Sequence, residues 1–159
     1  MTFLRLLQDA RTAVENFFTA SWGEHTPIEY QEVSITQTMP HLEWVRPSFQ
    51  LRYRSHRARL PNCNPEDLLG MIVVQVFVEV PKNGNATEAR SRANALAEEA
   101  FQIFAAPQIS GTETILHLSS QSIAQAGPRP GYVQVNVFVP FTLTVSSSGL
   151  DANAPIEPF

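Results

Sequence analysis

The chain has 159 residues, of which 43% are hydrophobic and 16% are charged. That length and apolar content are enough for one ordinary globular core and too little for two. Eleven Lys and Arg residues stand against 15 Asp and Glu residues, so the formal charge of -4 gives no global attraction to nucleic acid or to an anionic membrane surface. The single cysteine, Cys63, excludes an intramolecular disulfide and any zinc motif built on cysteine pairs.

The N-terminal segment is interrupted by charges that a signal peptide would not contain, at Arg5, Asp9, Arg11 and Glu15. No stretch of the sequence approaches the roughly 18 consecutive apolar residues of a membrane-spanning helix. We therefore expect a soluble protein that is not exported by the ordinary route.

Two segments have the spacing of amphipathic helices. Residues 3–18 repeat apolar side chains in steps of three and four, at Phe3, Leu7, Ala10, Val14 and Phe17, with Leu4 and Phe18 beside them. Residues 85–104 begin with Asn85 and, three residues later, Glu88, which is the spacing of a capping box. The inward stripe of this second helix consists of Ala89, Ala93, Leu96 and Ala100, and Glu88 is expected to pair with Arg92 on its outer side.

Other segments alternate with a period of two, as half-buried strands do. Residues 48–56 and 133–145 show the alternation most cleanly, and residues 70–80 carry Val or Ile at every second position, which is typical of a central strand. Residues 28–35 and 112–119 predict two further short strands. Residues 57–69 hold two prolines and two asparagines, which predicts a long exposed loop between strands.

This order of elements predicts an α+β fold. Two helices would pack on a mixed or antiparallel sheet of four to five strands, as a two-layer domain with one long strand-connecting loop. Residues 1–146 would form this single domain. Residues 147–159 lose periodicity and are rich in Ser, Pro and acidic residues, which favours a flexible C-terminal tail.

The sequence shows no pattern for catalysis, for a cofactor or for a metal. The four histidines are scattered, and no two lie three or four residues apart as metal ligands usually do: His25, His41, His56 and His117. The motifs of nucleotide-binding loops, nucleophile elbows and zinc proteases are absent, and no base is fixed near Cys63. We therefore expect no enzyme activity, no catalytic residue, no cofactor and no metal. Trp22 and Trp44 fit no helix or strand spacing, so either could cap the core edge or anchor an interface.

One charge feature stands above the background. Five of the 11 basic residues fall within 14 positions and are joined by a histidine, as Arg46, Arg52, Arg54, His56, Arg57 and Arg59. In one interpretation, acidic groups of the same subunit neutralise them on a solvated sheet face. In the other, they contact an acidic surface of another subunit or passing phosphates, both of which suit the planar guanidinium. The continuation of the cluster from the strand into the loop favours a protein contact.

The chain resembles the tail terminator proteins, or tail completion proteins, of long-tailed bacteriophages. The resemblance rests on the N-terminal amphipathic helix, the strand at 70–78 followed by Pro81 and Gly84, the alanine-rich helix at 86–104, and the closing segment at 131–141. That closing segment ends in Val139, Pro140 and Phe141. The resemblance covers residues 1 to about 146 and includes no catalytic signature.

The resemblance implies a structural virion protein with an α+β fold. Such a subunit forms a homo-oligomeric ring, a hexamer, on the end of the tail tube, stops tube polymerisation, and provides the surface for joining the tail to the head. Its partners would be other copies of itself, the tail tube protein and a head–tail connector or neck protein. DNA would pass through the ring without sequence-specific binding, and no membrane would be involved.

The implied location is the head-proximal end of the tail in the virion, after assembly in the host cytoplasm. The arginine cluster would then be the candidate subunit or tube interface. Two other classes remain open, namely a neck ring protein of the virion and, less favoured, a small α+β enzyme or ligand-binding domain. An enzyme should have a pocket with convergent polar groups, and a neck protein should bind the portal side and not the tube.

Overall fold

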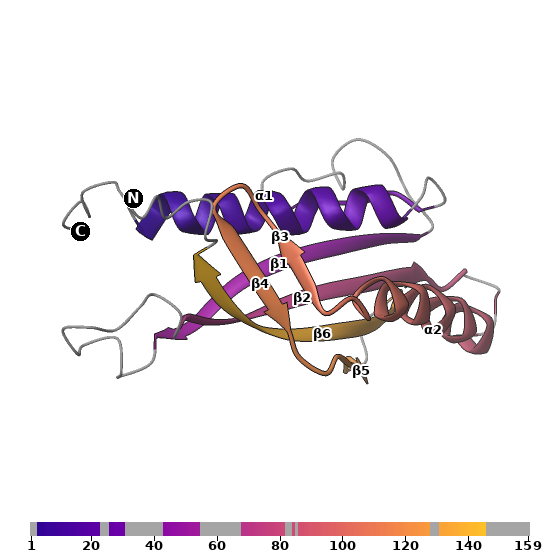
Figure 1. Ribbon diagram of the computed structural model, residues 1–159. Coiled ribbons are helices and arrows are strands. Elements are labelled where there is room, and N and C mark those ends of the chain that lie inside the picture. Colours follow the sequence, from indigo (N-terminus) through magenta and orange to yellow (C-terminus); the bar gives the residue numbers. More distant parts are fainter. Residues whose placement is uncertain are drawn as a thin grey trace, which may run out of the picture.

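The computed structural model describes residues 3–22, 26–30, 43–54, 68–81, 84, 86–127 and 131–145. Within them, two helices, α1 (Phe3–Trp22) and α2 (Ala86–Ile103), accompany six strands: β1 (Glu43–Arg54), β2 (Leu68–Glu79), β3 (Gln108–Ser110), β4 (Thr114–Leu118), β5 (Ser122–Gln125) and β6 (Tyr132–Val145). The strands form one antiparallel sheet in the order β1-β2-β6-β4-β3, with β5 also paired to β6 (Figure 1). The predicted two-layer α+β fold is confirmed, with one strand more than expected.

The centre of the sheet is the long pair β2 and β6. It runs from Leu68 opposite Leu143 to Glu79 opposite Tyr132, so β2 is paired along its whole length. β1 lies on the other side of β2, and its register is irregular at residues 51–53. The prediction of a central strand is confirmed, although β2 starts at Leu68 and therefore takes two residues from the loop predicted at 57–69.

β1 begins five residues earlier than the sequence predicts and contains Pro47. The N–H of Val45 donates to the carbonyl of Pro27 at 3.0 Å, and the carbonyl of Val45 accepts from Glu29 at 2.8 Å, so both groups of Val45 point away from β2. Pro47, two residues further along, points to the same outer edge. Its missing N–H therefore removes no hydrogen bond from the ladder between β1 and β2.

Of the strand predicted at 28–35, only residues 28–30 are described, and they contain an isolated parallel bridge between Ile28 and Val45. Residues 31–42 lie outside the described residues, as do residues 55–67 of the predicted loop. β6 ends at Val145, and the predicted tail at 147–159 also lies outside them.

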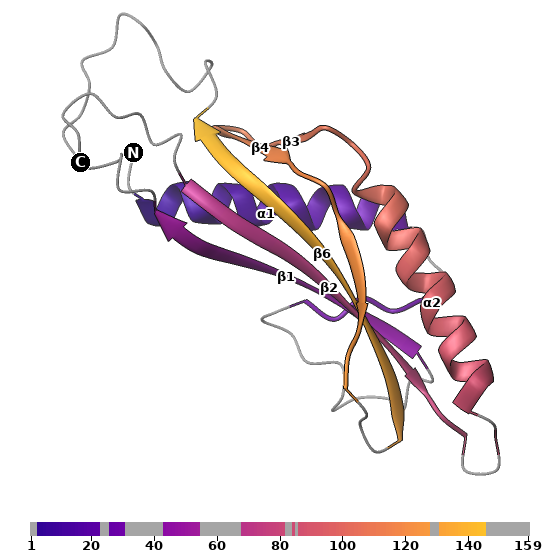
Figure 2. The same cartoon turned by 90° about the horizontal axis from the view of Figure 1, so that it is seen from below.

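A second proline stands inside the central strand β6. Two short strands pair in succession with the same edge of β6: β4 pairs with residues 141–145, and β5 pairs with residues 135–138. Pro140 lies opposite the gap between them, where its carbonyl accepts the N–H of Ser119 at 2.8 Å. Its missing N–H points to the same gap, where no strand needs it. Figure 2 shows β6 curving between β2 and β4.

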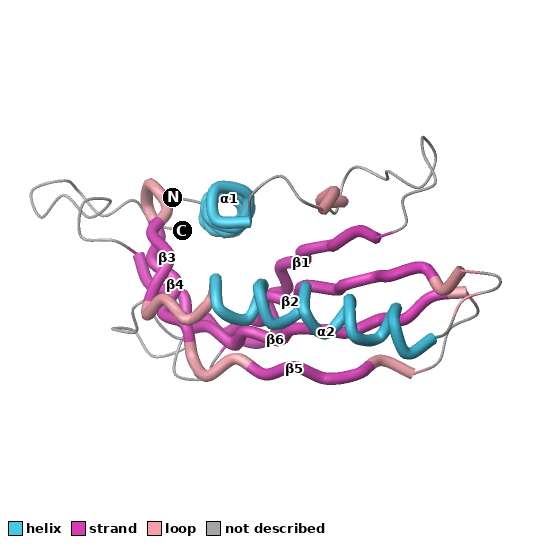
Figure 3. Tube along the Cα trace, turned by 90° about the vertical axis from the view of Figure 1, so that its right-hand side faces the viewer, coloured by secondary structure: helices cyan, strands magenta, loops and turns pink. Residues whose placement is uncertain are grey.

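The core lies between the sheet and the two helices. α1 buries its apolar stripe against it with Leu6, Ala10, Val14, Phe18 and Trp22, and α2 does so with Ala89, Ala93, Leu96 and Ala100. The ring of Phe18 stacks with Trp22 at 5.1 Å and with Phe104 at 5.8 Å, which joins the two helices. Figure 3 shows α2 lying along the strands with α1 above it. The predicted stripe of α2 is confirmed, whereas Leu4 of α1 is 63% exposed because the buried stripe runs through Leu6 instead.

An ion pair ties α2 to the start of β1. Arg92 donates from two nitrogens to the two carboxylate oxygens of Glu43, each at 2.8 Å, and the hydroxyl of Thr26 donates to the same carboxylate at 3.1 Å. The expected pairing of Arg92 with Glu88 is wrong. The guanidinium of Arg92 binds Glu43 instead, because both oxygens of that carboxylate can accept from it at once. These hydrogen bonds from Arg92 lower the pKa of Glu43 and raise that of Arg92, each opposed by burial.

Candidate functional site

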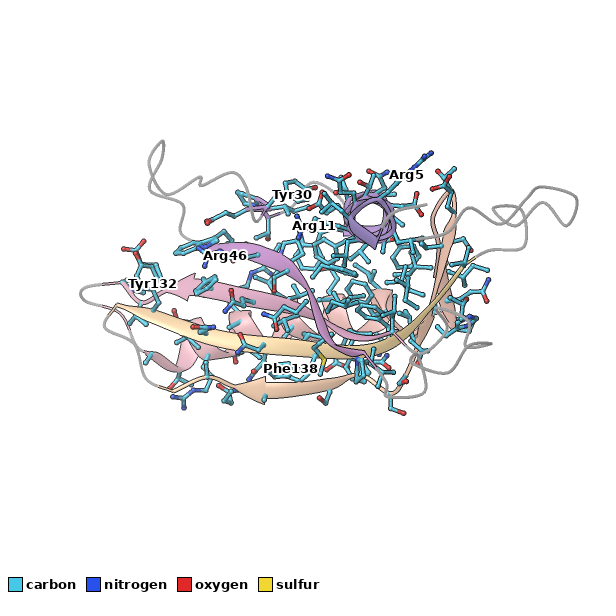
Figure 4. All side chains as sticks on the ribbon, turned by 90° about the vertical axis from the view of Figure 1, so that its left-hand side faces the viewer. Arg5, Arg11, Tyr30, Arg46, Tyr132 and Phe138 are labelled. Carbon is cyan, nitrogen blue, oxygen red and sulfur yellow. The ribbon has the colours of Figure 1, made fainter. Side chains whose placement is uncertain are left out.

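The sheet has a second face, turned away from both helices, which we call the outer face. It carries the side chains that alternate with the core residues of β1, β2 and β6: Trp44, Arg46, Ser48, Met71, Val73, Gln75, Phe77, Glu79, Tyr132, Gln134, Asn136 and Phe138. In Figure 4 the strands stand in front of α2, and Arg46, Tyr132 and Phe138 lie on this face. Within the described residues, no helix covers it.

The outer face is built around aromatic rings. Trp44 stands opposite Phe77 in the register of β1 and β2, and their rings stack at 4.9 Å. The ring of Tyr132 meets Trp44 edge-on at 5.2 Å. Trp44 and Phe77 are buried, whereas Tyr132 is 41% exposed at the rim. Large aromatic rings of this kind are enriched at protein interfaces, because they bury much area with few rotatable bonds.

An ion pair borders these rings. Arg46 donates to one carboxylate oxygen of Glu29 twice, from Nε at 3.1 Å and from Nη2 at 2.7 Å. The same guanidinium lies over the ring of Phe77, 5.3 Å from its centre. Glu29 reaches the outer face because residues 26–30 run along the edge of β1 through the bridge at Ile28. The side chain of Glu29 is only 7% exposed, so the pair is shielded from solvent on the carboxylate side.

Three buried polar atoms of this region have no hydrogen-bond partner among the described residues. They are the indole nitrogen of Trp44, the second carboxylate oxygen Oε2 of Glu29, and the amide oxygen of Gln134. Gln134 stands opposite Phe77 on β6 and uses its amide nitrogen to donate to Asn136 at 2.9 Å. A buried polar group without a partner costs free energy, and because these three atoms are already shielded within the subunit, another molecule could reach them only if the side chains around them moved. We call Glu29, Trp44, Arg46, Phe77, Tyr132 and Gln134 the Trp44 cluster.

The predicted interface residues fall into three groups according to where they lie in the structure. Arg46 is committed within the subunit to Glu29, which matches the first interpretation of the arginine cluster for this residue. Arg52 and Arg54 belong to the last part of β1, at the opposite end of the strand from Trp44. His56, Arg57 and Arg59 lie outside the described residues. Whether these residues form a subunit or tube interface remains a prediction.

A shallow hollow of about 550 Å³ lies between α1 and residues 108–112. At its rim, the carboxylate of Asp9 accepts the hydroxyl of Thr114 at 2.6 Å and the N–H groups of Thr112 and Glu113, both at 3.1 Å. Burial acts to raise the pKa of Asp9, but these hydrogen bonds together outweigh it and lower the pKa below its ordinary value. The carboxylate therefore stays ionised and holds α1 to the turn between β3 and β4, which suits a structural role better than that of a general base.

The described part of the chain contains no group of three His, Cys, Asp or Glu side chains that could hold a metal ion. His117 is exposed on β4 and forms a hydrogen bond with the hydroxyl of Thr144 at 3.0 Å. His25, His41 and Cys63 lie outside the described residues. Neither helix of the described residues is long and apolar enough to cross a membrane.

Sequence reasoning singled out Trp44 as an edge or interface residue but missed its partners. Glu29 is brought to Trp44 by the bridge between Ile28 and Val45. Tyr132 is brought there by the pairing of β1 with β2 and of β2 with β6. One signal was present in the sequence. Phe77 and Val73 are apolar on the outer side of a strand whose inner side is already wholly apolar, which indicates that part of the outer side is buried as well, and both side chains are buried.

Comparisons with known proteins bear on the fold. No family model matches the sequence, and no curated protein matches it. Among nine matching chains of solved structures, one protein without a functional name aligns with a TM-score of 0.64 and 12% sequence identity. The alignment covers 86% of this chain and 94% of that one. The likeness extends over almost the whole of both chains and concerns the fold alone.

Proposed function

We propose that this chain is a ring-forming structural subunit that ends the polymerisation of a bacteriophage tail tube and provides the surface on which tail and head join. The sequence resemblance to tail terminator proteins suggests this role, and the two-layer α+β fold is compatible with it. The protein would act at the head-proximal end of the virion tail, with the tail tube protein and a neck protein as its partners.

The observation that carries the proposal is the outer face. Within the described residues no helix covers this face, and the ring of Tyr132 is 41% exposed at its rim, which is compatible with a surface that another protein covers. In the hollow beside Asp9 the carboxylate is committed to the fold, so this hollow supports a structural role more readily than a reaction centre.

Termination needs no chemistry. A head-to-tail interface that fails to close makes a filament, whereas a subunit that closes a ring and binds the tube from one side only ends it. The ring must bind the last tube ring more tightly than another tube subunit does. A tenfold preference requires only about 1.4 kcal/mol, which a modest interface can supply.

The test is a titration of the purified protein into its cognate tube protein during polymerisation, with tube lengths measured by electron microscopy. We expect the mean length to fall as the dose rises, and a ring to be visible at one end of each tube. Unchanged lengths with decoration of portal complexes would favour the neck-protein alternative. Binding to neither, together with turnover of a small molecule, would overturn the virion proposal.

A further inference from the structure

We propose that β5 pairs with β5 of a second copy of this chain, antiparallel and across a twofold axis, so that one sheet runs through two subunits. This inference goes beyond the proposed function, because a twofold contact closes after two copies and is not the contact that builds a ring. Both partners of the contact are described residues, on an exposed edge of the sheet.

β5 stands at an edge of the sheet. Its four residues pair with β6 on one side, and all four are exposed. In Figures 1 and 3, β5 lies at the lower border of the molecule, and no described element stands beyond it. The N–H and C=O groups that point outward from such a strand form a row that can pair with another strand.

The hydrogen bonds between β5 and β6 fix which main-chain groups point outward. The N–H of Ala126 donates to the carbonyl of Gln134 at 3.1 Å, which continues the register of the two strands. Along an antiparallel pair, residues alternate between facing the partner strand and facing away from it. Ala124 therefore faces β6, whereas the N–H and C=O groups of Ile123 and Gln125 point to the free edge.

The edge of the sheet at β1 is protected, whereas the edge at β5 is not. The main-chain groups of Val45 are bonded to Pro27 and Glu29, and Pro47 has no N–H to offer. β3, at the other end of the sheet, has only three residues. β5 contains no proline and no charged residue, and its Ile123 is 38% exposed. Because proteins usually guard free edges with prolines, charges or a covering segment, an unguarded edge is typical of a strand that pairs with another chain.

The edge of β5 is complementary to itself. When two copies run antiparallel with Ala124 opposite Ala124 of the partner subunit, Ile123 of each copy stands opposite Gln125 of the other. These are the residues whose main-chain groups point outward, so each N–H meets a C=O. At the axis, where opposite Cα atoms approach to about 4.5 Å, both side chains are small methyl groups. No charge of the strand is brought against its own copy.

Self-pairing also covers an apolar side chain. Ile123 stands opposite the core residue Val137 of β6, so its side chain lies at the margin of the side that carries α2. Gln125 of the partner subunit would stand beside it on the same side of the joined sheet. The contact is short, so we expect a weak dimer that depends on concentration, as is typical of interfaces below about 1,200 Å².

The first test removes a main-chain donor from the full chain. Ile123→Pro deletes an N–H that points to the free edge, so no hydrogen bond between β5 and β6 is lost. Ile123→Ala is the matched control, because it shortens the same side chain and keeps the N–H. Sedimentation equilibrium would measure self-association, and circular dichroism would check folding. We expect Ile123→Pro to dimerise about tenfold or more weakly than Ile123→Ala, because half of the hydrogen bonds across the axis are lost.

The second test places charges at the axis. Ala124→Glu and Ala124→Lys each bring like charges directly opposite each other, so each variant alone should dimerise more weakly than the wild type. A mixture of the two should form heterodimers more tightly than either forms homodimers, which native mass spectrometry detects when one variant is isotope-labelled. Ala20→Glu and Ala20→Lys are the controls, because Ala20 is exposed on α1, at the opposite border of the molecule from β5 (Figure 1). They should dimerise like the wild type, with no preference for heterodimers.

Three results would overturn the inference: a wild type that stays monomeric up to about 1 mM, an Ile123→Pro variant that dimerises as tightly as Ile123→Ala, or a mixture of the Ala124 variants without preference for heterodimers. If Ile123→Pro does not fold, the Ala124 variants decide. The proposed function fails separately. A dimer disrupted by these variants, with wild-type protein that leaves tube lengths unchanged, would keep the β5 pairing and reject termination. Shortened tubes with a monomeric wild type would do the reverse.

Discussion

Replacing Gly70 with alanine should destabilise the fold by about 2 kcal/mol, within the range known for overpacked cores. Gly70 is a buried residue of β2 that stands opposite Leu51 on one side and Phe141 on the other. A Cβ added there would lie 2.6 Å from Cε1 of Phe141 and 2.7 Å from the carbonyl oxygen of Gln50. Glycine is therefore required by the close approach of a ring and of a neighbouring backbone.

The magnitude follows from what must move. Ordinary carbon contacts lie at about 3.5–4.0 Å, and Cζ of Phe141 lies still nearer to the added Cβ than Cε1 does, so the ring would have to shift by about 1.5 Å. That ring is 2% exposed and stacks with Phe49 at 5.1 Å, so it has little room, and the Gln50 carbonyl belongs to the backbone of β1. Overpacking of this kind costs up to about 3 kcal/mol. Alanine has less conformational entropy than glycine in the unfolded chain, and this difference stabilises the folded state by up to about 1 kcal/mol.

Thermal melting followed by circular dichroism would measure the effect, with an expected drop in Tm of roughly 4–8 °C for a domain of this size. Gly127→Ala is the matched control, because a Cβ at Gly127 would meet no atom within 4 Å, and its Tm should stay the same or rise. The double variant Gly70→Ala/Phe141→Leu should lose less than the two single changes together. A Gly70→Ala protein as stable as the wild type, or a strictly additive double variant, would refute the reasoning.

Two further predictions concern pH and the C-terminus. The lowered pKa of Asp9 contributes stability that is present above the ordinary carboxyl pKa of about 4 and is lost as the pH falls through the lower folded value. The Asp9→Asn variant lacks this contribution. In urea unfolding from pH 7 to pH 2, it should therefore lose less stability on acidification than the wild type does. An equal loss in both proteins would show that Asp9 does not contribute. Removing residues 147–159 should leave Tm within a few degrees of the full chain, and a fall of more than about 10 °C would show that the segment is structural.

Local patterns predicted the long elements well, because each of them satisfies its own periodicity. Alternation from Val133 to Val145 identified β6, and alanine spacing from Ala89 to Ala100 identified the buried side of α2. The short strands β3 and β5 were missed, since three or four residues show no period. The first part of β1 was missed because Pro47 suggested a connection, and only its position on the outer edge explains why a strand tolerates it.

The candidate site was less accessible to sequence reasoning, because it depends on register. Trp44 could be singled out, but its contact with Phe77 requires a specific pairing across a long connection, and its neighbour Tyr132 comes from a third strand. The ion pairs show the same limit. Sequence proximity favoured Glu88 for Arg92, whereas the fold supplied Glu43, which is 49 positions away.

The gap opposite Pro140 divides the outer edge of β6 into two parts with different partner strands. On one side of it β6 is joined to β4, which also contacts α1, and on the other side it is joined to β5, which contacts α2. At the gap itself, β6 stays paired with β2 on its other edge. On the outer edge of β6 at this point, the N–H of Ser119 donates to the carbonyl of Pro140, and neither β4 nor β5 pairs with that residue. Pro140 therefore stands where the outer edge of β6 passes from one partner strand to the next, a position at which a strand can lack an N–H without losing a ladder hydrogen bond.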